Sequence, residues 1–127
     1  MNEAALLQNY LVVGGLLFGI GLLHCSVTFI IAESPTETAL WFFSGGLALI
    51  YCAVLNLLRV RYAAIAPGLR RACAAVNLSL LAFIFAYLAA QGLAAFRNPG
   101  AAVLVACGLA ATAFSLFRRP AAPSGAS

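Results

Sequence analysis

Residues 24–46, HCSVTFIIAESPTETALWFFSGG, turn the chain sharply between two long apolar runs. This stretch contains the only histidine, the only tryptophan and two of the three acidic residues. Ser34, Pro35 and Glu37 form a capping pattern, in which the serine is the helix N-cap, the proline the first helical residue and the glutamate the third. We therefore expect two helices joined by a very short connection.

Outward from this turn, the chain contains further apolar runs of similar length. About 20 helical residues, at 1.5 Å each, cross a hydrocarbon core about 30 Å thick. The runs do not alternate with period two, and their abundant alanine and leucine favour helix. The sequence predicts an all-α integral membrane protein, with one domain at 1–119 and a disordered cytoplasmic tail at 120–127. Its four transmembrane helices are expected in an up-down-up-down bundle, at about 6–32, 36–58, 71–95 and 99–117.

The composition supports a membrane location. The chain is 65% hydrophobic and 8% charged, with a mean hydropathy of +1.05, whereas soluble domains are about half apolar and about a quarter charged. So few charged residues could not cover the apolar surface of a soluble fold. The first apolar run lacks a preceding basic region and is long for a signal peptide, so we interpret it as a retained span.

The arginines predict the orientation. The net charge of +4 comes from arginine alone, since the chain has no lysine, and this bias indicates a GC-rich bacterial source. With four spans, Arg97 lies on one side of the membrane, and all other arginines lie on the opposite side. The positive-inside rule then places both termini in the cytoplasm of a bacterium, with the helices in its inner membrane. The arginines on the cytoplasmic side are Arg59, Arg61, Arg70, Arg71, Arg118 and Arg119.

Small residues predict which helices pack closely, because lipid gives no hydrophobic drive between helices. Gly15 and Gly19 have GxxxG spacing in the first span, and Gly45 and Gly46 lie in the second. We expect these two helices to be the closest pair. The same surfaces could equally serve a homodimer.

One level of the bundle is a candidate ligand site. His24 lies roughly 13 Å from the outer end of its helix, and Ser44, Tyr87 and Cys107 fall at a similar depth. An ionisable side chain inside a membrane suggests a ligand, proton or substrate role, but we favour a neutral imidazole that bonds to Ser44, Tyr87 or a backbone carbonyl and holds the helices together. Glu33, at the outer turn, could collect cations for this site or simply be solvated.

Other polar residues have structural interpretations. Asn56 and Asn77 lie at similar depth on the cytoplasmic side and are expected to form an interhelical amide bond. Glu37 is expected to cap its helix. The four cysteines show no ligand spacing, so we expect buried free thiols and no metal site. They are Cys25, Cys52, Cys73 and Cys107.

No catalytic motif is present, so an enzyme is not expected. No cofactor is predicted, because one histidine is a poor basis for haem ligation. The leading hypothesis is a small non-enzymatic membrane protein, either an accessory or interaction subunit or a homo-oligomer. Its expected partners are the lipid bilayer and a second copy or a larger membrane protein, without nucleic acid. The alternatives are a small transporter or channel with a polar site around His24, and a lipid- or quinone-binding module.

Overall fold

The computed structural model describes residues 3–31, 36–62 and 65–116, and all regular secondary structure in these ranges is helical. Four α-helices are long and apolar enough to cross a membrane, which confirms the predicted all-helical class. The predicted tail at 120–127 lies outside the described residues. The elements are α1 (Glu3–Ile31), α2 (Glu37–Tyr62), α3 (Pro67–Gln91), the 3₁₀ helix η1 (Gly92–Arg97) and α4 (Pro99–Leu116).

The connection between α2 and α3 is shorter than the sequence indicates. The sequence predicts that helix two ends near residue 58 and helix three begins near 71, but α2 continues to Tyr62 and α3 begins at Pro67. Pro67 is the first residue of α3, a position at which a proline loses no helical hydrogen bond. α3 ends at Gln91, because the Gly92 φ of 61° lies outside the right-handed helical range, although the Gly92 N–H still donates to the Leu88 carbonyl.

The start of α2 differs from the predicted cap. Thr36 caps the helix, because its Oγ1 accepts a hydrogen bond from the Ala39 N–H at 3.2 Å. Glu37 is the first helical residue, so it cannot be the third residue of a capping box. Its carboxylate instead accepts from the Trp41 indole N–H at 3.4 Å. Ser34 and Pro35 lie outside the described residues.

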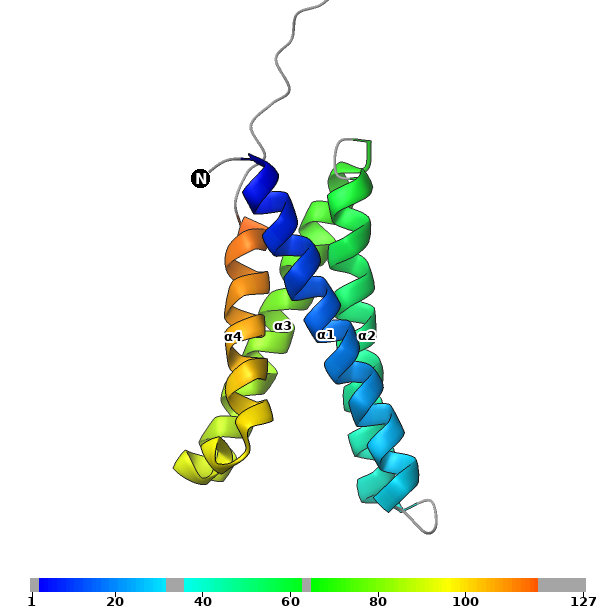
Figure 1. The fold of residues 1–127 in the computed structure, drawn as a ribbon, viewed down its shortest axis with the longest axis vertical. Helices are drawn as coiled ribbons and strands as arrows, with labels where there is room; N and C mark the ends of the chain where they lie inside the picture. The colour runs from blue at the N-terminus through cyan, green and yellow to red at the C-terminus, as the bar shows by residue number, and fades with distance from the viewer. Residues whose placement is uncertain (1–2, 32–35, 63–64, 117–127) are drawn as a thin grey trace, which may run out of the picture.

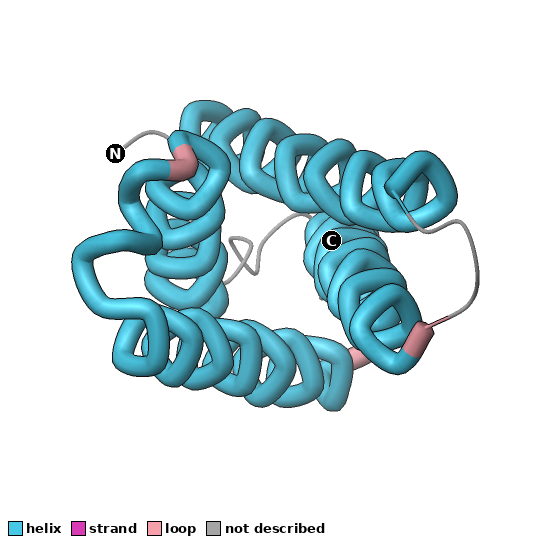
Figure 2. The backbone as a smooth tube through the Cα atoms, turned by 90° about the horizontal axis from the view of Figure 1, so that it is seen from below, coloured by secondary structure: helices cyan, strands magenta, loops and turns pink. Residues whose placement is uncertain are grey.

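The helices form a ring in which each α-helix packs against two others. α1 contacts α2 and α4, and α3 also contacts α2 and α4, as the view along the bundle shows (Figure 2). The α1–α2 contact is the most extensive, which confirms the predicted closest pair. Figure 1 shows that the α1–α2 pair and the α3–α4 pair separate toward the end where α1 finishes and η1 lies.

The close approach of α1 and α2 depends on Gly21 and Gly46. A Cβ atom on Gly46 would lie 2.7 Å from the Cys25 Sγ and 2.8 Å from the Gly21 carbonyl oxygen. Among the described residues, a Cβ on Gly15, Gly19 or Gly45 would have no neighbouring atom within 4 Å. The GxxxG pair is therefore the wrong prediction for this contact, and of the predicted packing glycines only Gly46 contributes to it.

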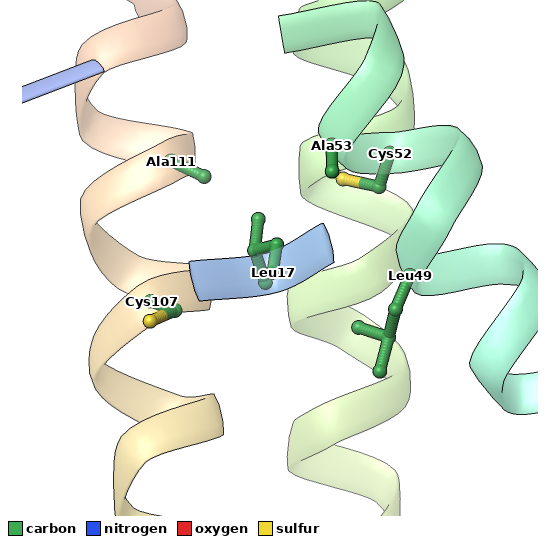
Figure 3. Packing of buried hydrophobic residues seen from close by; sticks show 6 residues of the cluster. All are labelled: Leu17, Leu49, Cys52, Ala53, Cys107 and Ala111. Carbon is green, nitrogen blue, oxygen red and sulfur yellow. The ribbon is translucent and has the colours of Figure 1, made fainter. Parts of the chain in front are cut away.

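The apolar core lies where α1 crosses between its neighbours. Leu17 has an exposed fraction of 0% and lies between α2 and α4 (Figure 3). Most of the residues around it are small, so the backbones come close. The buried residues around Leu17 are Leu49, Cys52 and Ala53 of α2 and Cys107 and Ala111 of α4.

Candidate functional site

His24 is half-buried on α1 and packs against α2. Its Nδ1 lies 3.3 Å from the Ile20 carbonyl oxygen of the same helix. The imidazole stacks on the Phe42 ring, with centroids 4.4 Å apart and an angle of 16° between the planes. The carbonyl of His24 accepts a hydrogen bond from the Thr28 hydroxyl at 2.9 Å. In these contacts the side chain is a packing group between two helices.

The predicted layer around His24 does not assemble. The Ser44 hydroxyl is exposed and donates to the Trp41 carbonyl at 2.8 Å, Tyr87 is 43% exposed, and Cys107 is buried in the apolar core. Within the described ranges, no hydrogen bond joins any of these side chains to His24. Glu33 lies outside the described residues.

The direction of each side chain and the order of the helices in the ring explain why Ser44 and Tyr87 do not meet His24. Counting residues from a helix end gives depth, but it does not give the direction in which a side chain points. Ser44 lies two residues from Gly46, or about 200° around the helix at 3.6 residues per turn, and Gly46 faces α1. Tyr87 is on α3, which is not a neighbour of α1 in the ring.

Buried polar side chains gather instead nearer the opposite end of the bundle, where α2 ends and α3 begins. We call this group, formed by Cys52, Asn56, Asn77 and Thr112, the amide cluster. The Asn56 Nδ2 donates to the Asn77 Oδ1 at 2.8 Å, and the Asn77 Nδ2 donates to the Asn56 Oδ1 at 3.0 Å. The two amides that the sequence places at similar depth thus face each other, with exposed fractions of 2% and 0%.

The amide cluster uses every N–H of its two asparagine side chains. The second Asn56 N–H donates to the Cys52 carbonyl at 2.8 Å, and the second Asn77 N–H donates to the Ala111 carbonyl at 3.0 Å. The Asn77 Oδ1 also accepts from the Cys52 thiol at 3.0 Å. An asparagine amide has only two N–H donors, so the two amides have no donor left for a ligand.

Further bonds connect the amide cluster to the helix backbones. The Thr112 hydroxyl donates to the Asn77 carbonyl at 3.2 Å, and the Ser115 hydroxyl donates to the Thr112 carbonyl at 2.7 Å. The Cys73 thiol donates to the Leu55 carbonyl at 3.0 Å, from α3 to α2. Among the described residues, no buried side-chain nitrogen or oxygen lacks a partner.

Arg59 extends the polar region to α1. This residue, which the sequence places at the membrane boundary, has an exposed fraction of only 7%. Its guanidinium donates to the Tyr10 hydroxyl, and the Tyr10 ring packs against Phe114 of α4 at 5.2 Å between centroids. The sequence contains a signal for the burial of Arg59 beside the amide cluster, because Cys52, Asn56 and Arg59 have the spacing of one helix face.

The described part of the chain contains no group of three metal-binding side chains, and its four cysteines are free thiols. Three of these thiols are buried and Cys25 is half-buried. Comparison of the chain with protein families, with characterised proteins and with solved structures gives no match. The contacts described above are therefore the basis for a functional proposal.

The stacking geometry predicts how His24 substitutions behave. His24→Ala should lower the free energy of unfolding by about 1 kcal/mol, because it removes the aromatic pair with Phe42. His24→Phe should keep most of the stability, because the stacked ring is retained. Denaturant titration in detergent micelles measures both. Equal losses for the two variants would show that the imidazole nitrogens matter more than the ring.

Proposed function

We propose that this chain is a non-enzymatic integral membrane protein that acts by binding other membrane helices, as a homo-oligomer or as an accessory subunit of a larger assembly. Its helices cross the bacterial inner membrane in alternating directions, with both termini in the cytoplasm. The arginines support this orientation. Four of them lie at the ends of α2 and α3 that the short connection joins, and Arg97 lies at the end of η1. The four are Arg59, Arg61, Arg70 and Arg71.

The closed amide cluster is the observation that carries this proposal. A transporter or channel needs polar groups that can exchange partners with a passing substrate. Here the asparagine N–H groups are all bonded to other parts of the protein, and they join α2, α3 and α4. Such a cluster fixes the helices relative to one another. The function then belongs to the outer surface of the bundle.

The outer surface has features suited to helix binding. The faces of Gly15 and Gly19 are open in the part of the chain that the structure describes, because a Cβ atom at either position would have no neighbouring atom there within 4 Å. A neighbouring helix could therefore approach the α1 backbone closely, as in other small-residue contacts in membranes. Large side chains also point outward from the helices, including Phe29, Trp41 and Phe83.

The direct test is to extract the protein from its native membrane in mild detergent and record a native mass spectrum. A partner protein at fixed stoichiometry, or a homo-oligomer of defined size, is the expected result. A monomer that carries a small polar solute would contradict the proposal and favour a transporter.

A substitution on the open face of α1 tests the homo-oligomer. Gly19→Ile should weaken self-association about tenfold, because the branched side chain keeps a second helix away. Energy transfer between labelled copies in vesicles measures this. Ala82→Ile is the matched control, since Ala82 is an exposed small residue on α3 and its substitution leaves the α1 face unchanged. If both variants associate like the wild type, this face is not the contact.

A further inference from the structure

An open groove on the outside of α1 and α2 has a distinctive lining. Its volume is about 490 Å³, within the range of about 300–1,000 Å³ that is usual for ligand pockets. Every lining residue is aliphatic except one, an arginine. The lining residues are Leu11, Val54, Leu57, Leu58, Val60 and Arg61.

The groove runs along the helix axis. Val54, Leu57, Leu58 and Arg61 have the i, i+3, i+4, i+7 spacing of one helix face. From Val54 to Arg61 the groove extends about 10 Å, at 1.5 Å per residue. Its aliphatic part therefore lies toward the middle of α2, and its charged part lies at the end of the helix. Gly14 lets Leu57 lie against α1, because a Cβ there would be 3.1 Å from the Leu57 Cδ2.

Arg61 is placed to bind an anion. It is the penultimate residue of α2 and of the apolar span, and its side chain is exposed. Its guanidinium lies 5.7 Å from the centre of the Tyr62 ring. Within the described ranges, no carboxylate or carbonyl oxygen accepts a hydrogen bond from it. A guanidinium at the end of a membrane span lies at the level of lipid phosphates, for which its planar donors are well suited.

We infer that this groove binds one anionic glycerophospholipid, with an acyl chain along Val54, Leu57 and Leu58 and the phosphate at Arg61. The charge complementarity favours an anionic lipid, because the cation of a zwitterionic headgroup neutralises its phosphate and repels the guanidinium. The aliphatic part of the groove leads away from the arginine toward the middle of α2, which is the direction that the first carbons of an acyl chain take from the headgroup into the hydrocarbon core.

The test uses native mass spectrometry of the full chain in detergent, with dioleoyl phosphatidylglycerol or dioleoyl phosphatidylcholine added. We expect one phosphatidylglycerol molecule to stay bound and phosphatidylcholine to dissociate. Arg61→Gln should weaken phosphatidylglycerol binding about fivefold, the equivalent of about 1 kcal/mol. Leu58→Trp, which fills the groove and keeps the arginine, should weaken binding by a similar factor. Circular dichroism checks that both variants remain folded.

Arg70→Gln is the matched control, since Arg70 is an arginine at the same end of the bundle but does not line the groove. It should bind phosphatidylglycerol like the wild type. Three results would overturn the inference: equal retention of the two lipids, equal losses in Arg70→Gln and Arg61→Gln, or full binding by Leu58→Trp. The last would mean that the headgroup binds without the groove.

Discussion

Asn77→Ala is expected to lower the free energy of unfolding by about 2 kcal/mol. The side chain of Asn77 takes part in four hydrogen bonds, with Cys52, the Ala111 carbonyl and both polar atoms of the Asn56 amide. Each such bond contributes about 0.6 kcal/mol on average in a membrane protein. Titration with SDS in mixed micelles, followed by circular dichroism, measures the loss.

A control variant and a double mutant test whether this loss of stability comes from the bonds between the two asparagines. Ser79→Ala is the control on the same helix, because the exposed Ser79 hydroxyl bonds only to the Ala75 carbonyl of α3, and it should change stability by less than about 0.5 kcal/mol. Asn56→Ala should lower the free energy of unfolding much less in the Asn77→Ala background than in the wild type, since the two amides share their bonds. Additive losses would show that the asparagines act independently, against the observed geometry.

Gly46→Ala is expected to destabilise the fold by about 2 kcal/mol. The added methyl group would lie 2.8 Å from the Gly21 carbonyl oxygen and 3.0 Å from the Cys25 backbone nitrogen. These are backbone atoms, so they cannot move aside as a side chain can, and α1 and α2 must separate. Overpacking of this kind typically costs about 1–3 kcal/mol. The same SDS titration measures it.

The neighbouring Gly45 gives a closely matched control. A methyl group there has no atom within 4 Å, so Gly45→Ala should leave stability unchanged or raise it by up to about 1 kcal/mol through better helix propensity. A loss in Gly45→Ala as large as that in Gly46→Ala would indicate a general sensitivity of α2 to substitution. In that case the close contact with α1 would not explain the result.

Hydropathy and helix punctuation predict the four apolar helices and the cap at the start of α4. At residues 98–100 the sequence has an asparagine followed by proline and glycine, which is typical of a helix start. The Asn98 side chain accepts a hydrogen bond from the Gly100 N–H at 2.9 Å. Counting residues from the helix ends also predicts correctly that Asn56 and Asn77 lie at the same depth in the bundle. The sequence does not give rotation about each helix axis, because an almost uniformly apolar helix has no polar face that identifies its exterior.

This missing rotation accounts for the errors. Gly15 and Gly21 both lie in α1, yet only Gly21 faces α2. Ser44 and Gly46 are two residues apart, but only Gly46 is buried. Charge alone predicts Arg59 at the membrane surface, whereas its side chain is buried. Arg59 is seven residues from Cys52 and therefore lies on the same face of α2. At this end of α2, the position of a residue on the helix face predicts its burial better than its charge does.

The unequal packing of the ring also has a consequence for how the protein assembles during synthesis. α1 and α2 are made first and share the most extensive contact, so the glycine-mediated hairpin can form before α3 emerges from the ribosome. Asn56 then has no partner on another helix, but it can still donate to the Cys52 carbonyl of its own helix. In the membrane location that we propose, this bond would keep the amide partly satisfied until α3 brings Asn77 to it. α3 and α4 would then pack against the preformed α1–α2 hairpin. The bonds between Asn56 and Asn77 would fix the position of α3 along α2.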